Sequence, residues 1–309
     1  MIERYPATSL SRLCYLLGIS RQAFYQNTWS WQQRTTREDV LINRILDIRK
    51  KQPAIGGRKL YRLLQEEIQQ HGLQMGRDAF FNMLSAYNLL VKKKVKRNVI
   101  TTMSRHRFRK YPNLIRYHNI EYPNEVWVAD ITYIPKRKGF YYLSLVTDEY
   151  SRKILGYCLS ESLQMCHTCE ALKMALTCLS DITLTRTLTH HSDRGVQYCS
   201  NEYVKILNQR SILISMTEDG DPLENAVAER INGILKSEFL TYIHLPEQLA
   251  KAQSVIGDII HTYNHYRPHM SLDWKTPAEI YESSGGHLLR HWCNYNLYKQ
   301  MAKNEDPSS

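Results

Sequence analysis

The sequence predicts a protein in two parts, an all-α region followed by a larger α/β domain. Three observations predict this. Apolar residues recur at helical spacing up to about residue 91, no acidic residue occurs over 92–120, and β-rich runs alternate with helical runs over 121–282. The 309 residues are enough for about two domains. Residues 283–309 are expected to form a C-terminal tail.

Residues 1–35 have the outline of a helix-turn-helix. Leucines recur at helical spacing over 10–17, and Gly18 ends that run. Ser20 is placed to cap a second, short helix over 21–26, because its hydroxyl can accept a hydrogen bond from an unpaired backbone N–H.

Residues 36–91 are predicted to form a second helical domain that binds DNA. Apolar positions mark helices near 40–48, 60–68 and 79–84, with proline and glycine between them. The predicted DNA contacts of this domain are Arg58, Lys59 and Arg77. An ordinary helical bundle is the alternative, and the neighbouring basic stretch favours DNA binding.

Residues 92–120 are interpreted as a basic linker. Nine Lys or Arg residues lie between Lys92 and Lys110, and no clear periodicity accompanies them. A linker along a DNA backbone explains this one-sided charge better than a solvated tether does, because each phosphate contact releases counterions. The predicted contacts are Lys92, Lys93, Lys94, Arg105, Arg107 and Arg109.

Residues 121–282 are expected to form an α/β sheet covered by helices. Strands are predicted from the enrichment in Tyr, Val, Ile and Leu over 126–134, 140–147, 153–159, 184–189 and 212–216. Helices are predicted over 163–179, 201–209 and 223–242.

Composition narrows the class of partner. Apolar residues make up 43% of the chain, and the net charge of +11 favours a polyanion such as nucleic acid. No run of eighteen apolar residues and no signal peptide is recognisable, so no membrane partner is expected. The seven cysteines are scattered and odd in number, which indicates reduced thiols in a cytoplasm.

Three acidic residues stand at informative places. Asp130 lies inside an apolar strand, where a carboxylate is costly unless it is paired or bound to metal. Asp193 follows the predicted fourth strand, and sites in α/β sheets lie beyond strand ends. Glu229 lies on the long predicted helix, and 35 residues separate it from Asp193. Two central strands and one helix can therefore bring the three acids together around Mg²⁺, which prefers oxygen ligands.

The long helix carries further polar residues on the face of Glu229. Asn225, Glu229, Asn232 and Lys236 are spaced by four, three and four residues, so they share one face. We expect Asn225, Asn232 and Lys236, with Arg230, to contact DNA, and Lys236 to hold the phosphate backbone near the metal.

These motifs resemble a known family, over roughly residues 40–282. The Asp130, Asp193 and Glu229 set with 35 intervening residues resembles the DDE transposases and retroviral-type integrases. The segments 191–198 and 225–236 look like the second-aspartate and Glu-helix motifs of that group. The segments 263–269 and 55–60 resemble the C-terminal and helix-turn-helix motifs of the insertion-sequence-3 family. Residues 1–110 offer too few His and Cys ligands for the zinc module of retroviral integrases.

The resemblance implies an RNase H-like integrase catalytic core in which Asp130, Asp193 and Glu229 hold two Mg²⁺ ions, with Mn²⁺ as a substitute. It implies DNA strand cleavage and strand transfer at the ends of an insertion sequence, with a circular intermediate. The implied partners are double-stranded DNA, both terminal inverted repeats and target, and at least one further copy of the chain. The implied location is the bacterial cytoplasm, at the nucleoid.

Two other functions and several isolated residues compete with this interpretation. A DNA-binding regulator without chemistry is disfavoured by the complete acidic triad, and a ribonuclease of the same fold is disfavoured by the helical N-terminus. Cys166 and Cys169 form a CxxC pair, interpreted as buried thiols rather than as zinc ligands. Asp148 is interpreted as a turn cap and Trp127 as a core residue, while His191 either tunes the site or orients its loop.

Overall fold

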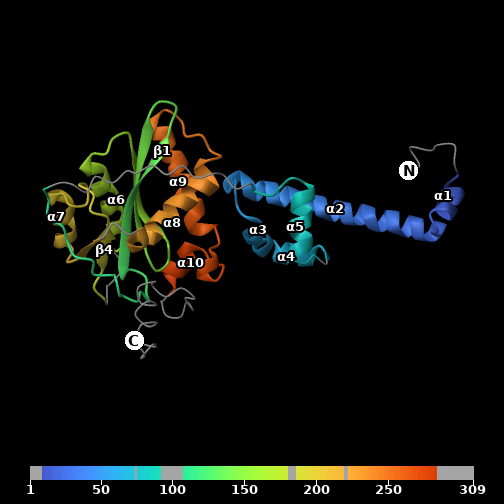
Figure 1. Ribbon diagram of the computed structural model, residues 1–309, viewed down its shortest axis with the longest axis horizontal. Coiled ribbons are helices and arrows are strands. Elements are labelled where there is room, and N and C mark those ends of the chain that lie inside the picture. The colour runs from blue at the N-terminus through green and yellow to red at the C-terminus, as the bar shows by residue number, and fades with distance from the viewer. Residues whose placement is uncertain (1–8, 74, 92–106, 180–185, 219–221, 284–309) are drawn as a thin grey trace, which may run out of the picture. The chain divides into compact units, whose positions relative to one another are not determined.

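The computed structural model describes residues 9–73, 75–91, 107–179, 186–218 and 222–283. The chain divides into two compact units, an N-terminal unit of Met1–Lys50 with Ile55–Val91, and a core unit of Lys51–Ala54 with Lys92–Ser309. Figure 1 shows helices alone in the first unit and a sheet with helices in the second. Each unit is described by itself.

The N-terminal unit contains five helices. They are α1 (Leu10–Leu16), α2 (Arg21–Lys51), α3 (Gly57–Leu63), α4 (Gln65–Gln70) and α5 (Arg77–Ala86). The turn after α1 has the predicted chemistry: Gly18 adopts a φ of 65°, which glycine tolerates at no steric cost, and Ala23 N–H donates to Ser20 Oγ at 3.0 Å.

Helix α2 is longer than the sequence suggested. The expected end at residue 26 and the expected domain boundary between residues 35 and 36 both fall inside one continuous helix of 31 residues. The physical reason is that no glycine or proline interrupts 21–51, so nothing stops the helix between its two apolar stretches.

The C-terminal part of α2 packs with α3, α4 and α5 around one small core. The buried residues are Leu41, Ile45, Ile55, Leu60, Leu64, Ile68, Met75, Phe80, Met83 and Leu84. This core agrees with the helical domain expected over 36–91.

The core unit is built on a five-stranded mixed sheet, as predicted. The strands are β1 (Val126–Pro135), β2 (Phe140–Asp148), β3 (Ile154–Ser160), β4 (Thr189–Ser192) and β5 (Leu213–Met216), in the order β3-β2-β1-β4-β5. The β1–β2 and β2–β3 pairs are antiparallel, whereas β1–β4 and β4–β5 are parallel. The strand expected over 184–189 begins only at Thr189, so that prediction was displaced toward the N-terminus.

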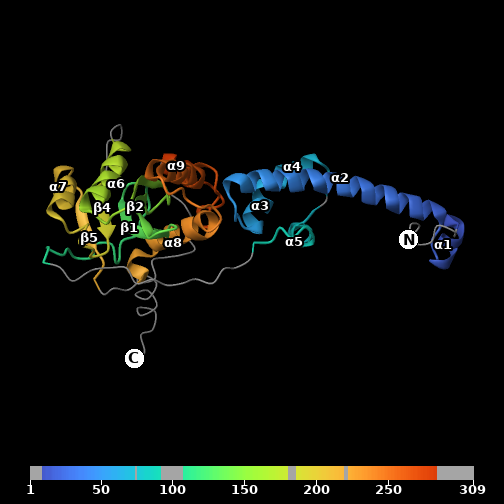
Figure 2. The same ribbon diagram turned by 90° about the horizontal axis from the view of Figure 1, so that it is seen from above.

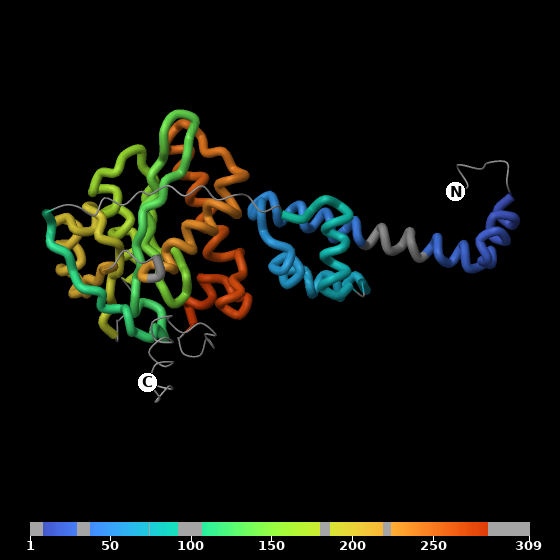
Figure 3. Tube along the Cα trace, viewed as in Figure 1, coloured from blue at the N-terminus to red at the C-terminus, as the bar shows by residue number. Residues whose placement is uncertain are grey.

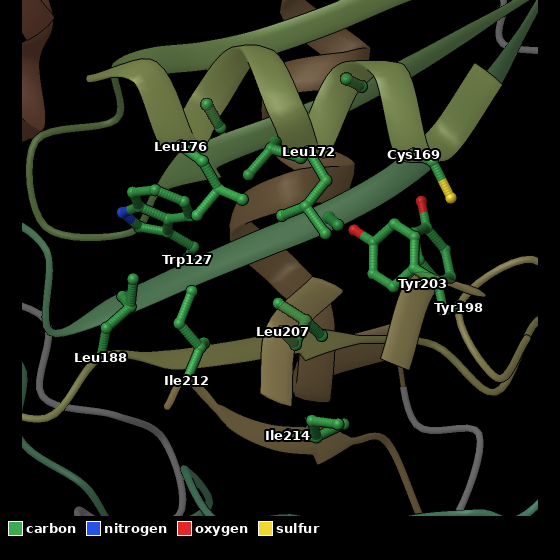
Figure 4. Packing of buried hydrophobic residues seen from close by; sticks show 14 of the residues in the cluster. Trp127, Cys169, Leu172, Leu176, Leu188, Tyr198, Tyr203, Leu207, Ile212 and Ile214 are labelled. Atoms are coloured by element: carbon green, nitrogen blue, oxygen red, sulfur yellow. The ribbon is translucent and has the colours of Figure 1, made fainter. Parts of the chain in front are cut away.

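Helices cover both faces of the sheet, as Figure 2 shows from above. On one face, α6 (Met165–Thr177) and α7 (Asn201–Gln209) pack over a cluster that includes Trp127, Leu172 and Tyr203 (Figure 4). On the other face lie α8 (Ala226–Ile234), the π-helix η3 (Leu235–Leu240) and α9 (Leu249–His265). A further helix, α10 (Pro277–Glu282), follows them, and two 3₁₀ turns lie at Pro222–Asn225 and Met270–Leu272.

The segment from residue 107 to residue 120, here called the edge segment, is not a free linker. Its contacts run along β5, the last strand of the sheet: Met216 N–H donates to Pro112 O at 3.2 Å, and Leu114 N–H donates to Ser215 Oγ at 2.9 Å. Ile115 and Ile120 are buried. The expected linker over 92–120 is therefore corrected, since buried apolar residues tie its second half to the core unit. Figure 3 shows the backbone of this segment running along the core unit. Residues 92–106 lie outside the described residues, as does the expected tail from residue 284 onward.

Within the described residues, no helix has the length and apolar character that a bilayer crossing requires.

Candidate active site

Strand register brings the two aspartates side by side. Asp130 is the fifth residue of β1, and its neighbour Ala129 lies opposite Ser192, the last residue of β4, in the parallel pair. Asp193 follows Ser192 directly, so the next position along each strand carries a carboxylate. This is the carboxyl end of β4, where an α/β sheet places its ligands.

Helix α8 supplies the third acid and crosses this end of β1. Asn232 Nδ2 donates to Asp130 Oδ2 at 2.7 Å, and Asn225 Nδ2 donates to the Ala129 carbonyl at 3.2 Å. The expected common face of Asn225, Glu229 and Asn232 is therefore turned toward β1. Both asparagines are buried, whereas Glu229 is exposed. Their side-chain amides hold the helix and the aspartate, so in this structure they contact protein groups.

The pKa of Asp130 is affected by the charges of the other two acids. Removal of its carboxyl from water, followed by the negative charge of Asp193 and a smaller effect of Glu229, raises the pKa of Asp130 to about 7. Hydrogen bonds from Ile131 N–H and Asn232 act in the opposite direction. Partial removal of the Lys236 ammonium group from water lowers its pKa, and the negative charge of Asp130 partly offsets this effect.

The loop after β4 fixes Asp193. Gly195 N–H donates to Asp193 Oδ1 at 2.9 Å. A Cβ atom at Gly195 would lie 2.9 Å from the same oxygen, closer than real Cβ contacts occur. The glycine in the motif is therefore required by the close approach of the carboxylate to the backbone.

The sequence did not single out Tyr198 as part of this site. Its ring is buried beside Tyr203 (Figure 4), and Asp130 and Asp193 contribute to a pKa raised well above the usual value, chiefly by burial. Among the described residues its hydroxyl has no hydrogen-bond partner. The only sequence signal was its place in the 191–198 motif.

His191 orients the loop through the sheet. It is fully buried, and its Nδ1 lies 2.8 Å from Ser215 Oγ on β5. Of the two roles left open for this residue, the contact supports the orienting one.

The other residues considered in the sequence analysis have structural roles outside the acidic triad. Asp148 is buried and accepts hydrogen bonds from Asn124 N–H and Ser151 N–H, both at 2.7 Å, so it caps a turn as interpreted. Trp127 is a core residue, and its Nε1 donates to Asn124 Oδ1 at 3.0 Å. Cys169 is buried in the core, as expected, but Cys166 is exposed and was not expected to be.

The predicted DNA-contacting cations fall into three groups. In the core unit Arg230, Lys236, Arg107 and Arg109 are exposed. In the N-terminal unit Arg58 is exposed, Lys59 is half-buried, and Arg77 is exposed and paired with Asp78 at 2.8 Å. Lys92, Lys93, Lys94 and Arg105 lie outside the described residues.

The chemistry of the three acids suits a divalent metal ion. All three donors are carboxylates, the ligands that Mg²⁺ and Mn²⁺ prefer, and their mutual repulsion at Asp130 is what a cation would offset. Within the described residues, the one His, Cys, Asp or Glu trio whose ligand atoms all lie within 4.8 Å is elsewhere.

Comparisons with known proteins agree with this geometry. Two models of the integrase core domain match residues 121–222 and 210–277. The chain is 33% identical over 274 residues to the uncharacterized 31 kDa protein of insertion element IS600 from Shigella sonnei, covering 87% of this chain and 97% of that protein. It is 31% identical over 254 residues to the transposase for IS629 from the same organism, covering 80% of each.

A solved structure with a similar fold is the HTLV-2 integrase catalytic core domain in complex with magnesium. It has a TM-score of 0.41 and 22% identity, and the match covers 52% of this chain and 98% of that one. The mixed sheet, the integrase core matches and the relatives from insertion sequences agree. The chain therefore belongs to the insertion-sequence-3 family of DDE transposases, and it is a polynucleotidyl transferase with an RNase H-like core and a helical N-terminal region.

Proposed function

We propose that this transposase cleaves DNA at the ends of its insertion sequence and transfers the freed strands, with Asp130, Asp193 and Glu229 holding two Mg²⁺ ions, for which Mn²⁺ can substitute. The integrase core family is in general dependent on a divalent metal. The assignment is supported chiefly by the strand register, which puts Asp130 and Asp193 at neighbouring positions of β1 and β4, and by the contact of Asn232 on α8, the helix of Glu229, with Asp130.

When bound, the metal ions would activate an attacking oxygen and stabilise the leaving oxygen of a phosphodiester. The chain's own residues do the positioning. Asn232 and the Ile131 amide fix both oxygens of Asp130, and the Gly195 amide fixes one oxygen of Asp193. Cleavage and transfer use the same residues, because the nucleophile is an oxygen of water in one step and of a DNA 3′-hydroxyl in the other.

Two exposed cations belong to the same stretch of chain as Glu229. Lys236 lies about two helical turns beyond Glu229 and Arg230 follows Glu229 directly, and both would contact DNA phosphates. Asn225 and Asn232 support the site from within and leave phosphate contact to these cations.

The helical unit would recognise double-stranded DNA of the terminal inverted repeats, through Arg58, Lys59 and Arg77, and the basic residues of 92–110 would lie along the backbone. Target DNA would occupy the same active site in the transfer step. Because two ends must be joined, we propose an assembly of at least two copies.

The test is the separate replacement of Asp130 and Asp193 by Asn and of Glu229 by Gln, with labelled end duplexes and Mg²⁺. Each variant is expected to lose nicking and strand transfer by at least about 10³-fold, because each removes a metal ligand, while end binding is retained. Asp258→Asn, an exposed acid on α9, is the control and should keep full activity. Robust joining by the Glu229 variant would refute the assignment.

A further inference from the structure

A second group of ligand-type side chains lies where β3 meets the first turns of α6. Cys158 on β3 and His167 and Glu170 on α6 place one ligand atom each within 4.8 Å of one another. Cys158 Sγ lies 3.0 Å from Glu170 Oε2, and His167 Nδ1 lies 3.7 Å from the same oxygen. None of these residues belongs to the acidic triad.

The backbone explains why this cluster forms. A Cβ atom at Gly156 would lie 2.0 Å from the Ala171 carbonyl oxygen and 2.7 Å from the Ala175 nitrogen, so α6 packs directly against β3 at the glycine. Side chains two residues apart on a strand point to the same face. Cys158 therefore faces α6 as Gly156 does, at the short separation that the glycine imposes.

The distances match a tetrahedral metal. With a zinc–sulfur distance of about 2.3 Å and zinc–nitrogen or zinc–oxygen distances of about 2.0 Å, neighbouring ligand atoms are separated by about 3.3–3.5 Å. The sulfur–oxygen separation of 3.0 Å is shorter than the expected value of about 3.5 Å, and the nitrogen–oxygen separation of 3.7 Å is longer than about 3.3 Å, so small side-chain shifts would complete the site. A mixed set of sulfur, nitrogen and oxygen suits Zn²⁺ and does not suit Mg²⁺, which takes oxygen ligands.

The outer contacts also fit a metal ligand. His167 Nε2 lies 3.2 Å from Ser162 Oγ, which leaves Nδ1 directed at the cluster. Metal-bound histidines are commonly held in this way through the second ring nitrogen. The Glu170 side chain is 61% exposed and that of His167 is 25% exposed, so an ion can enter from solvent without rearrangement.

We propose that Cys158, His167 and Glu170 form a zinc site, separate from the catalytic acids, that ties β3 to α6, with solvent at the fourth position. Burial and the hydrogen bond to Glu170 raise the pKa of the Cys158 thiol to about 12, so the thiol is protonated without metal. Zinc binding forms the Zn–S bond as the thiol proton passes to solvent. No oxidation or reduction is involved.

The experiment uses the full chain, reduced and stripped with a chelator, then titrated with Co²⁺ as a spectroscopic substitute for Zn²⁺. One equivalent should give a thiolate-to-cobalt charge-transfer band that Zn²⁺ abolishes. Metal at the catalytic carboxylates gives no such band, so Asp130→Asn should keep it. A failure of the zinc proposal is thereby distinguished from a failure of the proposed function.

Matched variants locate the site. Cys158→Ser should abolish the band, whereas Cys178→Ser, at a thiol of similar partial exposure, should retain it. His167→Gln and Glu170→Gln change more exposed side chains and should weaken cobalt binding at least tenfold with an unchanged circular dichroism spectrum. The thermal midpoint should rise with zinc in the wild-type chain and not in Cys158→Ser.

The result that overturns the proposal is equally specific. It is rejected if no thiolate band forms, if the band survives Cys158→Ser, or if peptide mapping of the freshly purified protein shows Cys158 in a disulfide with Cys166.

Discussion

Asn232 is the residue that most directly supports a catalytic acid without being one. Its amide donates to Asp130 Oδ2 at 2.7 Å from a buried position on α8. Asn232→Ala should lower strand cleavage or raise the Mg²⁺ concentration required by about 10–100-fold, because the carboxylate loses its orientation. Mg²⁺ titration of nicking measures this, with Asn208→Ala on the exposed side of α7 as control. Equal Mg²⁺ dependence in both variants would contradict the positioning role.

The two histidines of β4 predict a loss of stability in acid. Burial lowers the pKa of His190 to about 3 and that of His191 to about 4. Both pKa values lie below the unfolded value of about 6.5, so their contribution is complete above that pH and is lost as pH falls toward 4, when only the unfolded chain binds the protons. Each contributes up to about 1.4 kcal/mol per pH unit.

Urea unfolding between pH 7 and pH 5 measures this loss. Asp130, with its raised pKa, acts in the opposite direction, so the informative quantity is the difference in slope between the wild type and His190→Gln. The variant should show a flatter slope than the wild type, and His118→Gln, at an exposed histidine, should show the wild-type slope. An identical slope in all three proteins would show that His190 titrates normally.

Among single residues, the acids were easier to predict from the sequence than the residues that hold them in place. The placement of Asp130 and Asp193 at neighbouring strand positions was predictable, because a carboxylate in an apolar strand and a carboxylate just after a strand are visible in the sequence, whereas the catalytic role of these two residues and of Glu229 stays a prediction. The shared face of Asn232 was also predictable, but its partner was not. Helical spacing predicts which residues share one face of a helix. It does not predict whether that face contacts DNA or packs against a strand. Tyr198 was missed because an aromatic residue gives the same signal in any core.

Among the contacts between elements, the packing of β3 against α6 depends on Gly156, which has no side chain to separate the strand from the helix. Gly156→Ala should destabilise the core unit by about 1–3 kcal/mol, because the new methyl group meets backbone atoms of α6 at 2.0 Å and 2.7 Å and must displace the helix. Gly233→Ala is the matched comparison. A Cβ atom there meets nothing within 4 Å, and alanine in a helix should stabilise by about 0.5–1 kcal/mol. Urea midpoints that move in the same direction would disprove the packing argument.

Most elements were predictable because period-two and period-3.6 patterns are strong where one face is buried. Two errors have physical causes. Helix α2 continued through residues that the sequence pattern split, because a polar stretch without glycine or proline remains compatible with a helix. The edge segment was interpreted as part of a basic linker because its buried apolar residues follow no period. It contacts β5 through single hydrogen bonds rather than as a regular strand.

On the scale of the whole molecule, positive charge is densest between Lys92 and Lys110, where nine Lys or Arg residues stand without an acidic residue. Replacing Lys92, Lys93 and Lys94 with Ser should weaken end binding and lower the slope of log affinity against log salt by up to about 3, or about 0.9 per phosphate contact. Fluorescence anisotropy across salt concentrations measures the slope. Serine at the exposed Lys173, Lys205 and Lys251 is the matched control and should leave it unchanged. Equal slopes would make the basic stretch a plain tether.

The division into two units was predictable from the change in hydrophobic period near residue 91, whereas the place where the core begins was not. Glu224, just before the helix of Glu229, is buried. It accepts hydrogen bonds from Asn113 Nδ2 at 3.1 Å, from Arg116 Nη2 at 2.7 Å and from Glu218 N–H at 2.6 Å. Asn113 and Arg116 both belong to the edge segment.

A truncation designed to keep only the catalytic domain would naturally begin at residue 121, where the match to the integrase core domain starts. Such a fragment would remove Arg116 and Asn113, which hold the buried Glu224 carboxylate just before the helix that presents the third acid. A fragment that keeps these contacts to Glu224 therefore has to start before Asn113.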